Sequence, residues 1–528
     1  MDSTFGGKLI FYLGLAVVLA LPLTWGLLAL YGRALARGMM AQTKSQVTAP
    51  LPASPLRSPP AEAAAYLAAE RSLHGRLFRV LATCGLIPVL CLSTTDLLLG
   101  GEDLRATQFI AYAGAIGSLL VPMMKVYLGW SLRRGVAYFA VYLLAFCVLL
   151  VGWPMLRDLI IQGRFDPTLI SNALWFLQFL VLSTWLPLLL MTITGLPRLR
   201  TVLPVAILLA LATVVGPALA LEWVQSAVSG GPGAELLLRV GLTGTLLLSL
   251  AIGGLLAFGL LRLIAAQYQR KRFSDLQLLT DIWWLLVVFE ASAQWVAVSG
   301  HAWPAPFGLG VFAIYRVAVG LGFAHFPPSS ALPPNRRLLL LRVFGDSPRS
   351  ERLFDQLIQR WRYLGSVHLI AAPDLATRTI DPEDLLRFVQ GRLGDAFIAG
   401  PGELAARLDT LDEARDPDGR FRVTEFYCRD QSWRDTLLAL LPRSDAILMD
   451  LRGFSRARAG CAYELAELAR LGCLPRTTLL TDASTDRHFL NEILAGTAAR
   501  LIDDQALARE PTALFRSLLP GIPAPARL

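Results

Sequence analysis

Up to about residue 335 the chain alternates long apolar runs with short polar stretches, and after that the period of the pattern changes. Nine apolar runs occur before this point, at 9–31, 79–99, 107–128, 136–156, 169–194, 202–223, 240–261, 282–299 and 306–325. Each has about the length that crosses a bilayer as a helix. The pattern therefore predicts an all-α polytopic membrane domain over residues 1–325 with about nine transmembrane helices.

From residue 336 onward, short apolar runs alternate with amphipathic stretches. The strand-like runs are 337–345, 366–372, 421–428, 445–451 and 477–481, and the helical patterns are 350–364, one or two within 382–415, 432–441, 460–472 and 486–494. Strands separated by helices predict crossover units and a parallel sheet. We expect residues 336–528 to form an α/β, flavodoxin-like domain with a mainly parallel five-stranded sheet.

Two proline-rich stretches separate these parts. Residues 48–60 are rich in Pro, Ala and Ser and form part of a loop after the first apolar run, while 326–335 predict a short, stiff linker. Between the first stretch and the second apolar run, residues 61–79 have an amphipathic helical pattern. We predict that this helix lies along the inner membrane surface.

Composition supports the division and excludes several classes of protein. Apolar residues make up 54% of the chain and charged residues 17%, against about 25% charged residues in soluble domains. Residues 1–335 hold 22 Lys and Arg against 13 Asp and Glu, whereas 336–528 hold 27 of each. Because the basic excess lies in loops between apolar runs, it indicates membrane topology and not nucleic-acid binding.

The distribution of Lys and Arg also predicts orientation. Loops on one side of the membrane hold fifteen of them and loops on the other side hold five. The positive-inside rule places the fifteen in the cytoplasm. We therefore predict a multi-pass protein of the inner (plasma) membrane, in contact with the lipid bilayer, with its N-terminus outside and its C-terminal domain cytoplasmic.

Several kinds of chemistry are excluded in the C-terminal part. No lysine occurs after Lys271, which excludes a Walker A lysine and a Schiff-base lysine there. The six Cys form no C-x-x-C pair and the five His show no metal-ligand spacing. We predict no metal site and no resident cofactor.

The most informative stretch is 443–482. An apolar strand ends at Asp450, a polar turn containing Ser455 follows, and a helix opens near Gly460 with Glu464 one turn later. Open α/β sheets bind ligands at the carboxyl ends of their strands, and free N–H groups at a helix start attract phosphate. A carboxylate there would hydrogen-bond a ribose or stabilise positive charge during N-glycosidic cleavage. The alternative is that Asp450 is a turn residue and Glu464 an acid favoured by the helix dipole.

This stretch resembles the TIR domain family. The resemblance rests on Trp433 in the preceding helix, Ser444–Asp445 before the strand, Ser455 in the loop and the run from Cys461 to Leu465 (Cys-Ala-Tyr-Glu-Leu). It implies that Glu464 is the catalytic glutamate that cleaves NAD at its nicotinamide–ribose bond. The tryptophan that precedes the family's cysteine is replaced here by Gly460.

The same stretch is similar to the nucleoside deoxyribosyltransferases, in which an Asp ends the strand and G-x-x-x-E opens the helix. Asp450, Gly460, Glu464 and the turn Leu471–Gly472 fit that pattern. Both resemblances imply attack on an N-glycosidic bond, with NAD or a related nucleotide as substrate. They imply Glu464 as the catalytic residue and a ligand-binding set of Asp450, Ser455, Gly460 and Cys461.

Two charges lie inside the predicted membrane helices. Glu290 is near the middle of the run 282–299 and Arg316 near the middle of 306–325. Unpaired charges are expensive at that depth, so we predict a Glu290–Arg316 ion pair between the two helices. It would serve as an ion path, as a signal-sensitive latch or simply as a stabilising contact.

Together these features predict a membrane-anchored signalling or sensor protein whose TIR-like cytoplasmic domain cleaves NAD or a related nucleotide. One alternative is a non-enzymatic scaffold that associates with itself or with a partner. The other is a transporter or channel regulated by a nucleotide bound to the cytoplasmic domain. Nicotinamide release that depends on Glu464 separates the first function from the other two, and flux that depends on Glu290 or Arg316 indicates the third.

Overall fold

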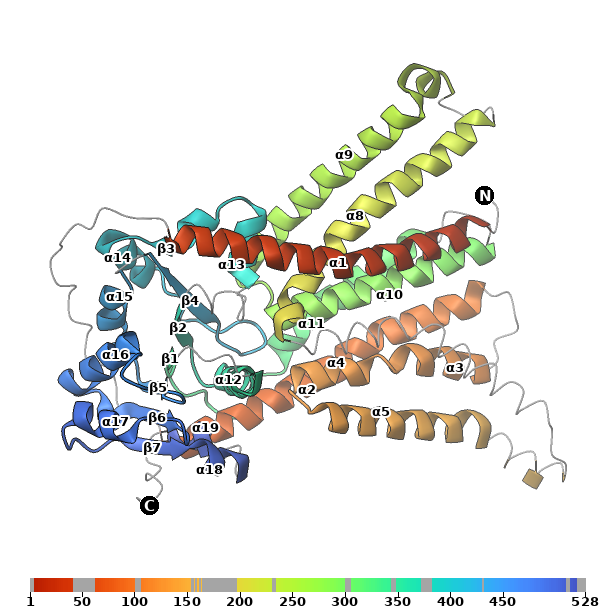
Figure 1. The fold of residues 1–528 in the computed structure, drawn as a ribbon. Helices are drawn as coiled ribbons and strands as arrows, with labels where there is room; N and C mark the ends of the chain where they lie inside the picture. Colours follow the sequence, from red (N-terminus) through yellow and green to blue (C-terminus); the bar gives the residue numbers. More distant parts are fainter. Residues whose placement is uncertain are drawn as a thin grey trace. The chain divides into compact units, whose positions relative to one another are not determined.

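The computed structural model divides the chain into two compact units. The first comprises residues 1–27 and 74–327, and the second comprises 28–73 and 328–528. The structure describes residues 4–40, 62–99, 106–152, 197–229, 234–299, 305–342, 348–371, 382–429, 432–509 and 513–519, together with 156, 159, 160 and 163. Each unit is described separately below (Figure 1).

The first unit is helical. Two of its helices, α1 and α2, also contribute residues to the second unit. The helices are α1 (Thr4–Met40), α2 (Ala63–Leu99), α3 (Ala106–Gly117), α4 (Leu120–Tyr127), α5 (Leu132–Cys147) with a π-helical turn η1 (Val148–Gly152), α8 (Pro197–Val228), α9 (Ala234–Gln269), α10 (Asp275–Ser299) and α11 (Ala305–His325).

Six helices among the described residues are long and apolar enough to cross a membrane, which is consistent with a membrane protein. They cover Gly14–Met40, Ala63–Thr95, Leu199–Gln225, Arg239–Gln269, Asp275–Val296 and Pro306–His325. Nine spans are not confirmed. The predicted span 169–194 and the proline-rich loop 48–60 lie outside the described residues.

The predicted spans 107–128 and 136–156 fall on shorter helices. The first is divided between α3 and α4 at Ser118 and Leu119. Pro122 follows this break and has no N–H to donate to the carbonyl of Ser118, and its ring disfavours helical geometry just before it. The second falls on α5 and the turn η1.

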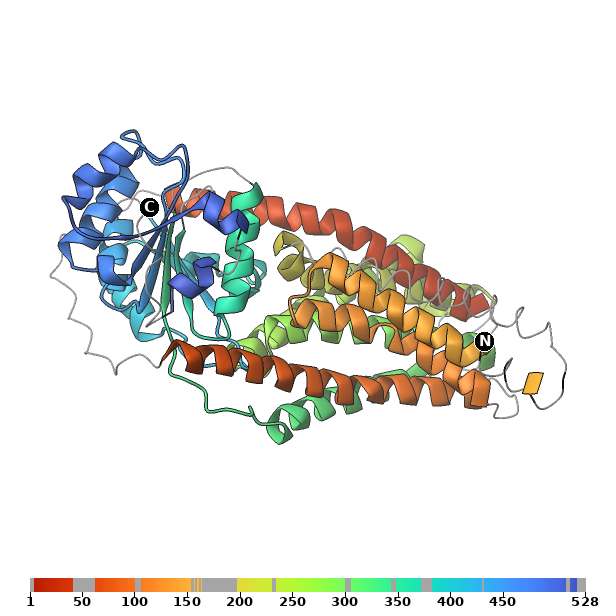
Figure 2. The ribbon, with the colours of Figure 1, turned by 90° about the horizontal axis from the view of Figure 1, so that it is seen from below.

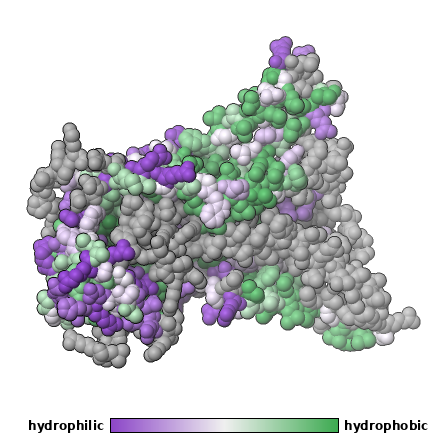
Figure 3. All heavy atoms as spheres, viewed as in Figure 1, coloured by the Kyte–Doolittle hydropathy of each residue, from purple (hydrophilic) through white to green (hydrophobic). Residues whose placement is uncertain are grey.

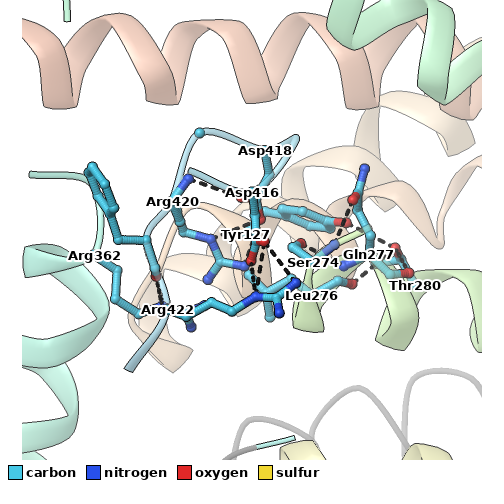
Figure 4. Close-up of polar contacts among 12 residues, drawn as sticks. Tyr127, Ser274, Leu276, Gln277, Thr280, Arg362, Asp416, Asp418, Arg420 and Arg422 are labelled. Carbon is cyan, nitrogen blue, oxygen red and sulfur yellow. Dashed lines mark hydrogen bonds and ion pairs between the residues drawn. The ribbon is translucent and has the colours of Figure 1, made fainter. Parts of the chain in front are cut away.

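The start of α10 is fixed by a reciprocal capping arrangement (Figure 4). The backbone N–H of Ser274 donates to Gln277 Oε1 at 2.8 Å, and the backbone N–H of Gln277 donates to Ser274 Oγ at 3.2 Å. This satisfies two N–H groups that a helix start otherwise leaves unpaired. One turn further, the hydroxyls of Thr280 and Tyr127 are 3.0 Å apart, which connects α10 to α4.

Helices α8 and α9 pack closely through small residues. A side chain at Gly253 would place its Cβ 2.5 Å from the carbonyl oxygen of Ala212, and one at Gly216 would approach that of Ser249 at 3.0 Å. Such close backbone approach is typical of membrane helix pairs. The outer face of α9 exposes Leu255 and other leucines, and apolar surface covers this helix pair in Figure 3, as expected for helices that face lipid.

The second unit is built on a seven-stranded sheet in which every neighbouring pair is parallel. Its strands are β1 (Leu338–Arg342), β2 (Val367–Ala371), β3 (Phe397–Ile398), β4 (Val423–Cys428), β5 (Ala446–Asp450), β6 (Thr477–Thr481) and β7 (Arg500–Asp503). Its helices are α12 (Pro348–Trp361), α13 (Pro382–Val389), α14 (Pro401–Asp409), α15 (Ser432–Leu440), α16 (Ala459–Arg470), α17 (Arg487–Leu494), α18 (Asp504–Arg509) and α19 (Ala513–Ser517), with short 3₁₀ turns η2 (Leu393–Ala396) and η3 (Leu474–Arg476).

The sheet corrects the predicted five-stranded, flavodoxin-like arrangement. The order is β3-β4-β2-β1-β5-β6-β7. Without the two-residue edge strand β3, this is the doubly wound order 3-2-1-4-5-6, whereas a flavodoxin-like sheet has 2-1-3-4-5. The order reverses between β1 and β5, so the crevice where such sheets bind ligands lies between the carboxyl ends of these two strands.

Alternating side chains place two apolar layers on the sheet. Leu339, Ile447 and Met449 point into a core formed with α14, α15, α16 and α17. Leu338 and Leu340, on the opposite side of β1, are also buried, and Trp361 of α12 packs edge-on against Phe515 of α19. Figure 2 shows α16 and α17 on one side of the sheet and α12 on the other.

The ends of α1 and α2 are part of this second unit. Tyr31 is fully buried, its hydroxyl lies 3.1 Å from that of Tyr427 in β4, and its ring packs edge-on against Phe388 of α13. The predicted amphipathic helix 61–79 is the first part of α2, continuous with the membrane span. Its buried residues, among them Tyr66 and Leu73, lie in the α/β unit, so the prediction that this segment lies along the membrane surface is wrong.

Candidate functional site

Asp450 is the last residue of β5 and lies beside the reversal of strand order, as the sequence predicts. Arg452, two residues later, binds both of its carboxylate oxygens, through Nε to Oδ1 and through Nη2 to Oδ2, each at 2.9 Å. Arg452 Nη1 also donates to Asp504 Oδ1 at 3.1 Å, at the start of α18. We call these three residues the Arg452 clamp; it connects the carboxyl ends of β5 and β7.

The turn after the clamp is tied to the next strand. Gly453 has φ of 72°, which a residue with a side chain rarely adopts, and its N–H donates to Asp482 Oδ1 at 3.3 Å. Ser455 is half-buried, and its carbonyl accepts the N–H of Arg458 at 2.9 Å. The turn that contains Ser455 is therefore held in a defined conformation.

Helix α16 begins at Ala459 without a side-chain cap. Gly460 is exposed, and no atom lies within 4 Å of the position that a Cβ would occupy there. The helix ends at Arg470, after which Gly472 has φ of 64°, as is usual just beyond a helix terminus. The start of α16 thus presents uncapped N–H groups at an accessible backbone position.

Glu464 lies one turn after Gly460 and is half-buried. Its Oε2 is buried and has no hydrogen-bond partner among the residues that the structure describes. Burial raises the pKa of this carboxyl from 4.5 to about 8. A carboxylic acid that is kept partly neutral near pH 7 by its surroundings is a common feature of functional sites.

Cys461 points away from the turn into the hydrophobic core beneath α16 and is buried. Burial is the largest cause that raises the pKa of its thiol to about 12, and the charge of Glu464 and that of Asp450 contribute to the shift. Both carboxylates therefore lie within electrostatic range of the same sulfur atom. The structure places Cys461 within the core.

Elsewhere in this unit, buried charges are paired. In the loop before β4, Arg420 and Asp418 are both fully buried and form an ion pair at 2.7 Å. Arg422 pairs with Asp416 at 3.0 Å, and Arg362 Nε donates to the carbonyl of Phe421 at 2.7 Å (Figure 4). Asp384 Oδ2 is also buried without a hydrogen-bond partner among the described residues, but the other oxygen of this carboxylate is paired with Arg387 at 3.0 Å. The unpartnered Oε2 of Glu464, for which the described residues provide no ion pair, therefore requires an explanation.

In the membrane unit, Arg316 pairs with Asp281 and not with Glu290, contrary to the prediction. Arg316 Nη1 and Asp281 Oδ2 are 2.7 Å apart. Asp281 and Glu290 are nine residues apart on α10, and at 3.6 residues per turn they lie on opposite faces of the helix. The prediction was based on the similar depth of Glu290 and Arg316 in the membrane. The pairing depends also on the helix face, and Asp281 lies on the face of α10 that contacts Arg316.

Two features of the site were not predicted. Asp504 follows β7, a four-residue strand whose pattern is too short to identify, and Arg452 reaches it from the β5 turn. The spacing Asp-x-Arg directly after a buried strand was the available signal for the pair Asp450–Arg452. Within the described ranges, no group of three metal-ligating side chains lies together.

The segments 343–347, 372–381 and 430–431, which follow β1, β2 and β4, lie outside the described residues. The described part of the site is thus the half formed by β5, β6, β7 and α16. In comparisons with known proteins, no family model, no curated protein and no solved structure matches the chain.

Proposed function

We propose that this protein is a membrane-anchored signalling protein whose α/β domain binds a nucleotide at the carboxyl ends of β1 and β5 and cleaves its N-glycosidic bond, with NAD as the first substrate to test. Glu464 is the proposed catalytic residue. The observation that supports it most is the buried Oε2 of Glu464, which has no hydrogen-bond partner in the described part of the chain and lies one turn after an exposed glycine at a helix start. The excess of Lys and Arg in loops on one side supports a cytoplasmic location for this domain.

The proposed reaction assigns a separate task to each part of the site. Uncapped N–H groups at Gly460 would bind a phosphate, and the Asp450 carboxylate would bind ribose hydroxyls. The bond between C1′ and the pyridinium nitrogen breaks, and its electron pair leaves with nicotinamide. Water adds at C1′ and releases one proton, while the ionised Glu464 stabilises the positive charge that develops on the ribose ring.

This role requires Glu464 in its ionised form. Because burial raises its pKa to about 8, the ionised fraction of the unliganded protein increases as pH rises through about 8. We expect kcat/KM for nicotinamide release to increase over the same range, with a limiting slope of one proton. A rate that is flat from pH 6 to 9 would contradict this assignment.

The decisive experiment measures nicotinamide release from NAD by full-length protein in detergent micelles or lipid discs. Glu464→Gln retains the size of the side chain and removes the charge, and we expect it to reduce the rate by at least about a hundredfold. Glu467→Gln, one turn later on the same helix, is the matched control and should retain activity. Equal rates for wild type and Glu464→Gln would remove the enzymatic proposal.

A non-enzymatic interaction scaffold is the second candidate, and one observation favours it. Both carboxylate oxygens of Asp450 are bound by Arg452, so a ribose would have to displace a charged partner before it bound there. The scaffold function predicts no nicotinamide release from either protein and unchanged self-association in Glu464→Gln.

A further inference from the structure

Helix α2, which contains a candidate membrane span, is joined to the α/β domain by a partly buried ion pair. Glu70 is 7% exposed, and Arg360 of α12 binds both its oxygens, through Nε to Oε1 at 2.6 Å and through Nη2 to Oε2 at 3.0 Å. The two residues are separated by 290 positions in the chain. Two-point binding of this kind fixes orientation as well as distance.

Arg360 lies near the end of α12 (Pro348–Trp361), and Phe354 in the middle of the same helix contacts the candidate site. Phe354, six residues before Arg360, is buried, and the guanidinium carbon of Arg452 lies 5.9 Å from the centre of its ring. Six residues of helix span about 9 Å. Helix α12 thus contributes Arg360 to the ion pair with Glu70 near its end and contacts the Arg452 clamp at its middle.

The clamp in turn determines whether Asp450 is accessible. While Arg452 holds both oxygens of Asp450 and one of Asp504, the Asp450 carboxylate already accepts three hydrogen bonds, counting that from the backbone N–H of Arg452, of the about four that a carboxylate can accept. A small displacement of Phe354 would change the position of the guanidinium, because the side chain of Arg452 is 10% exposed and has little space in which to reorient.

We propose that the Glu70–Arg360 ion pair is the control point through which α2 regulates the Arg452 clamp, with α12 as the connecting element. A displacement or rotation of α2 would move α12, release Arg452 from Asp450 and open the carboxyl edge of β5. The regulatory role of the clamp rests on the proposed function of the site, whereas the mechanical connection does not.

Cys461 provides a local probe of this connection. It is buried in the first turn of α16, one turn before Glu464 and directly after the turn that contains Arg452 of the clamp, and we expect opening of the clamp to increase its access to solvent. Cys473 is buried in the same hydrophobic core, beyond the far end of α16, and serves as an internal control. The two cysteines lie on separate tryptic peptides, so mass spectrometry reads them independently.

The experiment compares maleimide labelling of both cysteines in full-length protein in lipid discs. We expect Glu70→Gln to increase the labelling rate of Cys461 by about tenfold and to leave that of Cys473 unchanged. The double replacement Glu70→Arg/Arg360→Glu should return Cys461 to within about threefold of wild type. Glu62→Gln, exposed just before α2, is the matched control on the same segment.

Two results would overturn the proposal. One is an unchanged labelling rate of Cys461 in Glu70→Gln; the other is a parallel increase for Cys461 and Cys473, which would indicate general loss of stability. If Glu70→Gln does not accumulate as folded protein, Glu70→Asp keeps the charge, shortens its reach and permits the same comparison. Labelling requires no catalysis, so failure of this coupling and failure of NAD cleavage are distinguishable.

Discussion

At the scale of single residues, Glu464 differs from every other acid of its surroundings. Asp450, Asp482 and Asp418 each accept several hydrogen bonds from nearby N–H or hydroxyl groups. Glu464 Oε2 lies in the same kind of buried position without such a partner in the described part of the chain. A protein tolerates such a group at a cost in stability, and that cost depends on pH.

Glu464→Gln should therefore change stability in a pH-dependent manner. The folded-state pKa of about 8 lies above the value of 4.5 expected for the unfolded chain. The favourable contribution of the neutral acid is complete below about pH 4.5 and is lost as pH rises through about 8. The variant should differ from wild type by no more than about 1 kcal/mol at pH 5 and exceed its free energy of unfolding by on the order of 5 kcal/mol at pH 8.5.

The apparent unfolding temperature of detergent-solubilised protein, followed by tryptophan fluorescence at both pH values, measures this difference. Glu467→Gln is the control, because Glu467 is paired with Arg470 on the surface of the same helix. A difference between wild type and Glu464→Gln that is the same at pH 5 and pH 8.5 would show that the carboxyl is not buried as described.

The pair Asp418–Arg420 gives the opposite case, in which a buried charge is satisfied. Both residues are fully buried, so Asp418→Asn would remove the charged acceptor to which the Arg420 guanidinium donates two hydrogen bonds, at 2.9 and 2.7 Å. Loss of one partner of a buried pair typically costs about 3–5 kcal/mol. Chemical denaturation should show a loss of this size for Asp418→Asn, and a loss below 1 kcal/mol would indicate that water reaches this loop.

At the scale of elements, the sequence predicted strands and helices correctly where the apolar pattern was long and flanked by turns. The strands β1, β2, β4, β5 and β6 and the helices α12, α15, α16 and α17 fall where the apolar pattern predicts them. The strands β3 and β7 have two and four residues, too few to show a period. Strand order depends on crossovers between distant segments, which local patterns do not determine.

The candidate site was predictable to a similar extent. The order Asp450, Gly460, Glu464 along a strand, turn and helix follows from sequence. The bond from Arg452 to Asp504 does not follow from the sequence, because it depends on the position of β7, which lies two strands away from β5 in the sheet. Likewise, the sequence predicted a similar depth in the membrane for Glu290 and Arg316. It did not predict which face of α10 is turned toward Arg316, and that face carries Asp281.

Because Arg316 pairs with Asp281 and not with Glu290, replacements of these two acids of α10 should differ in their effect on stability. Asp281 is buried and paired with Arg316, whereas Glu290 lies on the opposite face of the helix. We expect Asp281→Asn to lower the apparent unfolding temperature by several degrees, because Arg316 then loses its counter-charge in an apolar region. Glu290→Gln should change it by less than about one degree, since no ion pair is lost. Equal effects would contradict the assigned pairing.

At the scale of the whole molecule, the α/β domain extends beyond the part of the sequence that reads as α/β. Residues 28–73 belong to its compact unit, and their described parts are the last residues of α1 and the first residues of α2, two helices that also contain candidate membrane spans. Tyr31, Leu35, Ala69 and Leu73 are all fully buried, although their pattern in the sequence does not distinguish contact with protein from contact with lipid. For this reason the boundary at residue 336, predicted from the sequence, leaves residues 28–73 out of the α/β domain.

The fragment 336–528 expressed alone should consequently be less stable than the same residues in the full-length protein. Without residues 28–73, Tyr427 loses its contact with Tyr31, and Arg360 loses both bonds to Glu70, so apolar surface on β4, α12 and α13 becomes exposed to water. Limited proteolysis should cleave the isolated fragment near β4 at least about tenfold faster. Equal protection would show that residues 28–73 contribute nothing to the fold, and activity assays on the fragment would then be valid. Faster cleavage would restrict such assays to the full chain, because an inactive fragment would reflect a missing part of the fold and not a missing activity.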